Sequence, residues 1–471
     1  MTVPHIPALR RGRAYQSLDQ SNIVNCRTGE VLATLSQVNP GLIRKDLARV
    51  SEARAALRKI PAARLLEICA RAGEQFLTGT LPLGGGTQSP GQYEESLSAG
   101  SGLPRVMVRR NMAKIHSALA NMGTILRGLT RGLDPAVLDQ GYGGRLCFYP
   151  ASPCLGLVMP SNSPAVNSLW LPAIPLKIPV MIKPGREEPW TPWRLIQAFI
   201  AAGCPADAFG FYPADHEGAG EILRGCGRAL LFGDQGTTAP YANNPAIQIH
   251  GPGHSKILLG EDQIERWPEF LDVMADSIAD NGGRSCINAS AIVVPRHAEE
   301  IADALARRLG PLAPLPDGDE NARLAAFANP RMADFIDSAI EEGLQTPGAR
   351  EVTASCRQGP RKVCFQGALY LRPTIVLCDS FAHPLANREF LCPYASVVTV
   401  PQPAMLEAIG PSLAVTAITR DAAFIAQLVE SPLIERLNVG PVSTLAVSWD
   451  QPHEGNMFDF LYKRRALEIS Q

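Results

Sequence analysis

The sequence predicts an α/β protein built from two doubly wound blocks that face each other across a cleft. Short apolar strands alternate with helix-length segments from residue 155 onward, which is typical of βαβ units and a parallel sheet. A second block with the same alternation begins after residue 250 and extends to about residue 443. Parallel sheets bind ligands at the carboxyl ends of their strands, so a site is expected there.

The first third of the chain is predicted to be mainly helical. Residues 42–77 and 105–129 repeat apolar side chains at helical spacing among strong helix formers. Residues 78–104, which contain two glycine-rich stretches, are predicted to form a loop. Residues 141–144 are predicted to form a turn that leads into a strand.

The two blocks supply the remaining elements in order. In the first block, strands are predicted at residues 155–159, 180–183, 209–211, 229–232 and 247–249. Its helices are predicted at residues 164–174 and from Thr191 to Gly203, where Pro192 suits a first helical turn. In the second block, strands are predicted at 291–294, 375–377 and 397–400, and a helix at 298–309.

The composition is that of an ordinary globular protein and argues against several classes of partner. The chain has 471 residues, of which 46% are hydrophobic and 19% charged, so two or three domains are expected. A formal charge of -1 provides no field that would attract nucleic acid or an anionic membrane, and neither is expected as a partner. The arginine-rich stretch at residues 9–13 is interpreted as a solvated tail in preference to a binding patch.

Cellular location is predicted from the absence of a secretory signal and from the cysteines. No apolar segment follows the early basic residues, and the most apolar run, 168–182, is too short to span a bilayer. The eleven cysteines include no CxxC pair, so neither a metal site nor a disulfide framework is expected. Free thiols in such a chain predict the reducing cytoplasm.

Cys286 is the first candidate for catalysis. It lies in a turn of small residues, 280–288, directly before an apolar strand, and two glycines in this turn allow close approach and unusual backbone angles. His250 opens a second compact turn 36 residues earlier. A thiol and an acid/base residue on neighbouring turns are what nucleophilic thiol chemistry needs. The alternative is a buried structural cysteine.

Five motifs, taken in order, resemble those of the aldehyde dehydrogenase superfamily. Asn162, in Pro160-Ser161-Asn162-Ser163-Pro164, is similar to the proline-flanked asparagine of that family, and Lys183-Pro184 to its strand-end Lys-Pro. The turn that ends in Cys286 resembles the turn of the catalytic cysteine. The later Pro-Thr and Glu-aromatic-x-x-Pro motifs are similar to Pro373-Thr374 and to Glu389-Phe390-Leu391-Cys392-Pro393. The agreement covers residues 155–420, more than half of the chain.

The resemblance implies an aldehyde dehydrogenase-like fold. It would comprise a Rossmann-type nucleotide-binding domain at 1–249, an α/β catalytic domain at 250–443 and a small oligomerisation element. That element would consist of a hairpin at 142–151 and the tail at 444–471, and would build a homodimer or homotetramer. The tail contains large apolar side chains, which in a monomer would form an exposed patch.

The resemblance also implies a role for each matched residue. Cys286 would attack a carbonyl carbon, and the Asn162 amide would hold the oxyanion together with the Cys286 backbone N–H. Lys183 and Glu389 would bind ribose hydroxyls of NAD or NADP, near Pro160. For Asn162 the alternative is a turn-forming role, and for Lys183 and Glu389 a surface charge.

Two departures from the family concern the cofactor. No GxGxxG is present, and the phosphate-facing Gly-Ser turn is replaced by residues 232–237, where Gly233 and its neighbours would present backbone N–H groups to a pyrophosphate. Arg186 stands where NAD-preferring relatives often have a glutamate, and its guanidinium suits the 2′-phosphate of NADP. Glu187 or Glu188 could reverse that preference.

A third departure concerns the acyl acceptor. His250 stands where the family normally has the glutamate that activates water, although histidine can also act as a base. Members that transfer the acyl group to or from coenzyme A lack that glutamate and resemble this chain better. We therefore favour an acyl-CoA reductase or CoA-acylating aldehyde dehydrogenase. The alternatives are a hydrolytic aldehyde dehydrogenase that gives a carboxylic acid, and a catalytically silent binding or assembly subunit.

Overall fold

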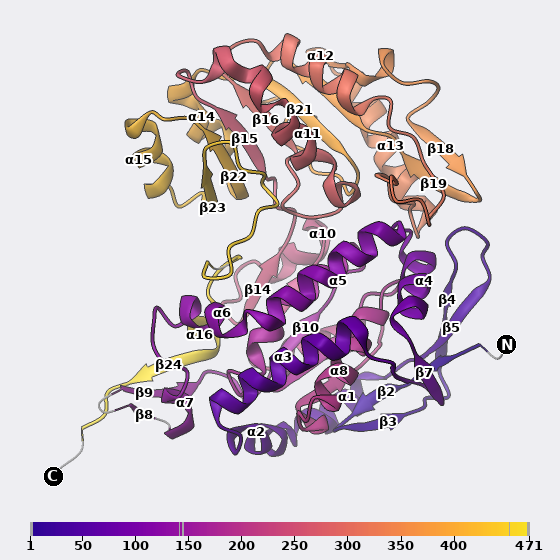
Figure 1. Ribbon diagram of the computed structural model, residues 1–471, viewed down its shortest axis with the longest axis vertical. Coiled ribbons are helices and arrows are strands. Elements are labelled where there is room, and N and C mark those ends of the chain that lie inside the picture. The colour runs from indigo at the N-terminus through magenta and orange to yellow at the C-terminus, as the bar shows by residue number, and fades with distance from the viewer. Residues whose placement is uncertain (1–2, 141, 144–145, 452, 469–471) are drawn as a thin grey trace.

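The computed structural model describes residues 3–140, 142–143, 146–451 and 453–468, and two seven-stranded sheets organise them (Figure 1). The first sheet lies among the indigo and magenta helices, and the second lies in the orange and yellow part of the chain above them. The predicted α/β class with parallel sheets is confirmed. Within the described ranges, no helix has the length and apolarity needed to cross a membrane.

The N-terminal segment forms strands. The strands β1 (His5–Ile6), β5 (Val31–Ser36) and β4 (Gln20–Val24) form a small sheet. The hairpin of β2 (Ala8–Arg10) and β3 (Arg13–Tyr15) extends the first large sheet, where Leu9 pairs antiparallel with Phe211. The interpretation of residues 9–13 as a solvated tail is therefore wrong, because their backbone is part of this sheet.

Two helical regions follow, as predicted, but the loop predicted between them is wrong. The first region divides into α1 (Pro40–Leu47), α2 (Val50–Arg58) and α3 (Ala62–Thr78), and the second contains α5 (Arg105–Ala120) and α6 (Met122–Leu129). Residues 78–104 form a hairpin of β6 (Leu81–Leu83) and β7 (Gly86–Gln88), followed by α4 (Pro90–Ser101). Ser89 and Gln92 form a capping box that starts α4.

The first large sheet has the strand order β14-β13-β10-β11-β12-β2-β3. Its five parallel strands were all predicted: β10 (Leu155–Val158), β11 (Val180–Lys183), β12 (Phe209–Phe211), β13 (Ala229–Phe232) and β14 (Ile247–His250). The helices α8 (Trp190–Ala201), α9 (His216–Gly225) and the short α10 (Gln235–Thr238) lie between them in sequence. Residues 164–174 form 3₁₀ turns instead of the predicted α-helix, since Pro172 cannot donate an intrahelical hydrogen bond.

The second large sheet has the order β17-β20-β21-β16-β15-β22-β23. Its parallel strands are β15 (Lys256–Leu259), β16 (Ala291–Val294), β20 (Thr374–Cys378), β21 (Tyr394–Thr399), β22 (Ser412–Ile418) and β23 (Ile434–Val439), with β17 (Ala349–Glu351) antiparallel at one edge. The associated helices are α11 (Leu271–Ala279), α12 (Ala298–Leu309), α13 (Pro330–Leu344), α14 (Gln402–Ile409) and α15 (Ala422–Glu430). A separate hairpin consists of β18 (Lys362–Phe365) and β19 (Ala368–Leu371).

The chain ends in a small three-stranded sheet of order β24-β9-β8, which projects from the body in Figure 1. The short α7 (Val137–Gln140) precedes β8 (Tyr142–Gly143) and β9 (Leu146–Pro150), while α16 (Met457–Leu461) precedes β24 (Tyr462–Arg465). Residues 141, 144 and 145 of the predicted turn lie outside the described residues. The expected apolar patch on the tail is wrong, because most of its large side chains pack into the core of their own chain: Met457, Phe458, Leu461 and Tyr462.

Candidate active site

The three predicted catalytic residues line one cavity of about 390 Å³. His250 ends β14 in the first sheet, and the chain then crosses directly to β15 in the second sheet. Cys286 lies between α11 and β16 of that second sheet, and Asn162 follows β10 of the first. The cavity is therefore formed where the carboxyl ends of the first sheet meet the second block.

The backbone before Cys286 has the unusual angles that its glycines suggested. Asn281, Gly282 and Gly283 have φ values of 55°, 67° and 67°, all in the left-handed region. A side chain at Gly283 would also collide with the backbone of Cys392 and Pro393. Only glycine satisfies both conditions at that position, which fixes the path of the chain into the cysteine turn.

The Cys286 thiol is held in a half-buried position and keeps its proton. The Cys286 carbonyl accepts a hydrogen bond from Ser255 Oγ at 2.9 Å, which anchors the turn to the start of β15. Burial raises the pKa of the thiol, and the carboxylates of Glu389 and Glu454 raise it further, against a smaller opposing effect of Arg436. Attack on a carbonyl therefore requires a base that takes the thiol proton.

The Asn162 side chain is fixed beside the cysteine turn. Its Nδ2 donates to the Arg284 carbonyl at 2.8 Å, which leaves the second N–H of the amide for another acceptor. Its Oδ1 is buried, with no hydrogen-bond partner among the described residues. This geometry is compatible with an amide that donates to a substrate oxygen.

His250 is oriented by a carboxylate that the sequence prediction missed. His250 Nδ1 is hydrogen bonded to the Glu454 carboxylate, and its ring stacks on Phe232 with centroids 4.4 Å apart and an interplanar angle of 11°. His250 Nε2 is buried without a partner among the described residues. When Nδ1 donates to Glu454, Nε2 of the neutral ring has a free lone pair.

The tail that supplies Glu454 is itself fixed to the cavity. Gln248 Nε2 donates to the Glu454 carbonyl at 2.8 Å, which joins this segment to β14. The adjacent His453 accepts a hydrogen bond on Nδ1 from Arg436 at 2.8 Å. Burial, with the Arg436 charge, lowers the pKa of His453 to about 3, so this ring is neutral at ordinary pH. No local motif marks Glu454, because its contact with His250 joins positions 204 residues apart, and none marks His453 either.

A buried asparagine on α5 links the asparagine turn to the cysteine turn. Asn111 Nδ2 donates to Asn281 Oδ1 at 2.8 Å, and Asn111 Oδ1 accepts from Ser163 Oγ at 3.1 Å. Asn281 Nδ2 in turn donates to Ser285 Oγ at 3.0 Å. The sequence prediction missed Asn111, whose only signal is a polar residue on an otherwise apolar helical face.

Lys183 and Glu389 have different surroundings in this structure. Lys183 ends β11, is half-buried, and has no hydrogen-bond acceptor among the described residues. Burial lowers the pKa of its ammonium group, against an opposing effect of Glu187. Glu389 Oε2 instead accepts from the His254 backbone N–H at 2.7 Å, and burial raises the pKa of this carboxyl to about 7.

In the loop after Lys183, Arg186 is exposed, and one of the two acidic residues that follow it is buried. Glu188 is buried and accepts from the Thr191 backbone N–H at 2.7 Å, so its carboxylate faces the start of α8. Glu187 is half-buried, and its backbone N–H donates to Ser161 Oγ at 3.2 Å. Of the two residues that could reverse a preference for NADP, only Glu187 lies close to Lys183.

Pro160 and Gly233 lie at neighbouring strand ends. Pro160 contacts Gly185, so the ends of β10 and β11 pack closely. Gly233 follows β13, and a short helix begins two residues later, as the pyrophosphate expectation required. However, the Asp234 carboxylate accepts from the Thr237 N–H at 2.8 Å and already occupies part of that helix start. Within the described residues, no cluster of three or more His, Cys, Asp or Glu side chains is suited to hold a metal ion.

Comparison with known proteins identifies the family. A sequence profile described as the aldehyde dehydrogenase family matches residues 104–409, which is more than half of the chain. The chain belongs to the aldehyde dehydrogenase family. An aminoacetaldehyde dehydrogenase of Pseudomonas aeruginosa is 26% identical over 266 residues, covering 52% of this chain and 50% of that protein. A second relative, described as an aldehyde dehydrogenase of Staphylococcus haemolyticus, is 24% identical over 57% of this chain and 58% of its own length. The chain thus matches little more than half the length of these curated relatives.

Solved aldehyde dehydrogenase structures share the fold over nearly the whole chain. The aldehyde dehydrogenase KauB of Pseudomonas aeruginosa superimposes with a TM-score of 0.80 at 15% identity, covering 98% of this chain and 96% of its own. An indole-3-acetaldehyde dehydrogenase in complex with NAD+ also gives a TM-score of 0.80, at 17% identity and with 99% and 97% coverage. At such low sequence identities the similarity establishes the fold alone, and the chemistry must be argued from the residues of the site.

Proposed function

We propose that this protein is an NAD(P)-dependent aldehyde dehydrogenase that oxidises an aldehyde through a thioester on Cys286 and releases the product by hydrolysis. One observation supports this most directly: Cys286, Asn162 and the hydrogen-bonded pair of His250 and Glu454 all line one cavity. Within it lie a nucleophile, an oxyanion donor and an oriented base, which are the groups this reaction needs.

The strand ends of the first sheet fit a nicotinamide cofactor. Lys183 supplies an ammonium group that lacks an acceptor among the described residues, at an edge where parallel sheets bind nucleotides. Two of the similar solved structures contain NAD+ by their descriptions. When bound, the cofactor would accept the hydride. We propose that Lys183 binds its ribose, that Pro160 and Gly233 border it, and that Arg186 contacts a 2′-phosphate. Glu389 would also bind a ribose hydroxyl once its hydrogen bond with the His254 backbone N–H is broken.

The residues of the cavity would have different roles in the reaction. The Cys286 thiol loses its proton to His250 Nε2 and attacks the aldehyde carbon, while the Asn162 amide donates to the developing oxyanion. After oxidation the acyl group remains on Cys286 as a thioester. His250 Nε2, having released its first proton to solvent, then takes a proton from the attacking water, and Glu454 stabilises the resulting imidazolium.

The lining of the cavity favours an apolar aldehyde. Large apolar side chains from several elements line the cavity, among them Ile125, Leu129, Val166, Leu169, Leu445, Val447, Trp449 and Met457. Lys114 is the lining residue with a formal positive charge, and the Glu454 carboxylate is already paired with His250. A cavity of about 390 Å³ with these walls suits a medium-length alkyl or an aromatic aldehyde.

A second candidate function is acyl transfer to or from coenzyme A. The sequence favours it, because the water-activating glutamate of the family is replaced by His250 and is followed by the Gly251-Pro252-Gly253 turn. A thiol acceptor is far more acidic than water and needs less help from a base. The fixed His250–Glu454 pair therefore favours water as the acceptor of the acyl group, whereas the Gly-Pro-Gly turn favours coenzyme A as the acceptor.

Product analysis with and without coenzyme A distinguishes the two functions. The purified protein is incubated with octanal or benzaldehyde and with NAD+ or NADP+, and the products are identified by mass spectrometry. Carboxylic acid formed without coenzyme A is expected. Acyl-CoA as the only product, with strict dependence on coenzyme A, would establish the second function. If none of these mixtures gave turnover, the protein would be a catalytically silent member of the family.

A further inference from the structure

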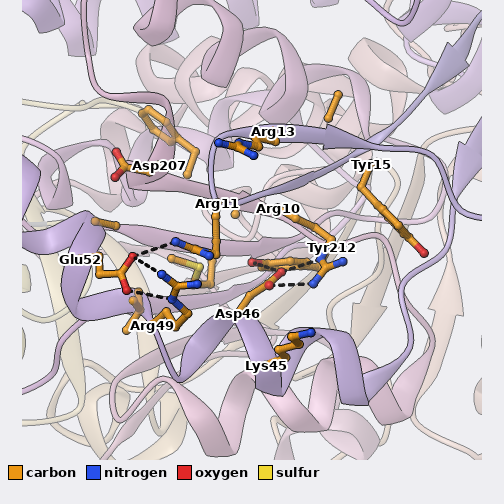
Figure 2. A pocket seen from close by; sticks show the side chains of 16 residues that line it. Arg10, Arg11, Arg13, Tyr15, Lys45, Asp46, Arg49, Glu52, Asp207 and Tyr212 are labelled. Atoms are coloured by element: carbon orange, nitrogen blue, oxygen red, sulfur yellow. Dashed lines mark hydrogen bonds and ion pairs between the residues drawn. The ribbon is translucent and has the colours of Figure 1, made fainter.

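A second cavity lies beside the first large sheet and is lined by none of the proposed catalytic residues. Its volume is about 610 Å³, and none of its lining residues also lines the catalytic cavity. Its lining residues come mainly from the β2–β3 hairpin, the helices α1 and α2, and the strands β11 and β12. Figure 2 shows their side chains. Its volume lies within the range of small-molecule sites.

The lining of this cavity is rich in cations. Five basic side chains line it, against three carboxylates: Arg10, Arg11, Arg13, Lys45 and Arg49, with Asp46, Glu52 and Asp207. The floor and walls also include apolar and aromatic groups: Ala14, Tyr15, Val50, Ala53, Met181, Phe209 and Tyr212. The residues 9–13 that the sequence suggested to be a solvated tail thus supply three of the five cations.

Two of the carboxylates already serve to position arginines. Asp46 is buried and accepts from Arg10 Nε and Nη2, both at 2.8 Å, and from the Tyr212 hydroxyl at 3.4 Å. The Arg10 guanidinium also lies 5.0 Å from the centroid of the Tyr15 ring. A guanidinium group held by a buried carboxylate loses little further conformational entropy when it binds a ligand, and its remaining N–H groups are available as donors.

A second carboxylate holds two more arginines. Glu52 accepts from Arg49 Nε at 2.8 Å and from Arg11 Nη2 at 2.8 Å, as the dashed lines in Figure 2 show. Arg11 has a φ of 50°, a left-handed angle that is uncommon for a residue other than glycine, asparagine or aspartate. This turn and the Glu52 contact fix the tip of the hairpin over α2.

The remaining cations have no such partner. The side chains of Arg13 and Lys45 line the cavity but form no hydrogen bond or ion pair with any residue in the described ranges, and no dashed line reaches them in Figure 2. Asp207 is the remaining lining carboxylate and forms no ion pair within those ranges either. The cavity therefore has more positive than negative side chains over an apolar and aromatic floor, and two of the positive side chains, Arg13 and Lys45, are unpaired.

We propose that this cavity binds a small molecule with two adjacent phosphate groups, at a site separate from the catalytic cavity. Arg13 and Lys45 would contact the phosphates directly, and the Arg10 and Arg49 forks would donate their remaining N–H groups. The Tyr15 ring and Met181 would pack against the organic part of the ligand. Met181 lies two residues before Lys183 on β11, so an occupied cavity would adjoin a strand of the cofactor site.

Inorganic pyrophosphate is the simplest probe of this site. Its binding to the full-length protein is measured by isothermal titration calorimetry in the presence of saturating NAD+, so that the cofactor site is already occupied. One saturable site per chain is expected, with an affinity that falls as the salt concentration rises. The double variant R13Q/K45Q should bind pyrophosphate at least about tenfold more weakly, because charge-assisted contacts are lost.

A charge-matched control separates this site from general attraction. Lys59 and Arg331 are exposed, do not line the cavity and form no ion pair within the described residues, so K59Q/R331Q removes the same charge elsewhere. This control should bind pyrophosphate as the unmodified protein does. Equal weakening in both double variants would overturn the proposal, as would unchanged binding in R13Q/K45Q or the absence of saturable binding to the unmodified protein. Because Arg13 and Lys45 are exposed, both variants should fold, which thermal unfolding verifies.

Discussion

At the scale of single residues, the thiol of Cys286 is protonated at rest although the reaction needs a thiolate. Burial and two nearby carboxylates raise its pKa, so the surroundings protect the thiol until a base and a substrate are in place. Cys286→Ala should abolish turnover and leave cofactor binding, followed by fluorescence titration, nearly unchanged. A variant that kept a tenth of the rate would show that another group is the nucleophile.

Asn162 should act mainly in the transition state. Asn162 lines the cavity, and one N–H of its amide is free while the other is held on the Arg284 carbonyl. Removal of one oxyanion donor costs roughly 10²-fold in kcat, and the contact strengthens as charge develops. Asn162→Ala should therefore lower kcat by about that factor with little change in KM. A large change in KM alone would instead assign Asn162 to substrate binding.

Glu454 should determine how well His250 works as a base. Glu454→Gln can present an N–H to His250 Nδ1, which places the ring proton on Nε2 and removes the Nε2 lone pair. We expect release of the acyl group to slow by about 10²-fold, the lower range of general base catalysis. Single-turnover measurements should show a slower burst of reduced cofactor as well as slow release, because His250 Nε2 also takes the proton of Cys286 before attack. Glu435→Gln, an exposed change outside the cavity, serves as the control, and an unchanged release rate in Glu454→Gln would contradict the role.

The sequence could place Cys286 and Asn162 in a candidate site because each lies in a local turn with a recognisable order of residues. It could not identify Glu454, whose contact with His250 joins positions 204 residues apart. That contact depends on how the tail packs, which no local pattern specifies. Asn111 was missed for a related reason, because a polar residue within a helix has many structural explanations.

At the scale of elements, the start of α8 contains a buried acid. Burial raises the pKa of Glu188 to about 8, against the hydrogen bond from Thr191. Between pH 4.5 and about 8 the unfolded chain releases this proton while the folded chain keeps it, so the unfolding free energy falls as pH rises. The slope approaches about 1.4 kcal/mol per pH unit for one proton.

Glu188→Gln should remove this dependence while keeping an acceptor for the Thr191 N–H. In urea unfolding between pH 5 and pH 9, the variant should lose less stability with rising pH than the unmodified protein. Glu187→Gln, which changes a half-buried carboxylate of the same loop, should leave the slope nearly unchanged. Parallel curves for Glu188→Gln and the unmodified protein would show that Glu188 is ionised in the folded state.

Strands were easier to predict than the elements between them. The five parallel strands of the first sheet are short apolar runs between turn residues, and burial on both faces produces that pattern. Residues 78–104 were mistaken for a loop because their glycines were given more weight than the Ser89–Gln92 capping box. The segment at 164–174 has helical spacing, but its prolines permit only 3₁₀ turns.

At the scale of the whole molecule, the two α/β blocks were predictable because each repeats strand and helix in sequence. The hairpin of β2 and β3 was not, since its pairing with β12 joins residues about 200 positions apart. The burial of the tail was also missed. Its apolar residues alone do not show whether they cover their own chain or a second copy.

The projecting sheet still predicts a homodimer or homotetramer, although for a different reason from the tail. All five residues of β9 are half-exposed, and they include Leu146, Phe148 and Tyr149. Phe148 packs on Phe458 of the same chain, with ring centroids 5.2 Å apart, but this contact covers only part of the strand. A three-stranded sheet with an apolar central strand gains stability when a symmetry-related copy covers it.

Light scattering at micromolar concentration should therefore give the mass of a dimer or tetramer. Tyr149→Glu, which places a charge on the half-exposed strand, should shift the mass toward the monomer because a buried charge in the interface would be unpaired. Arg331→Glu changes the charge at the exposed start of α13, in the second block, and should leave the mass unchanged. A monomeric mass for the unmodified protein would refute the assembly and would leave β9 as a half-exposed strand of a single chain.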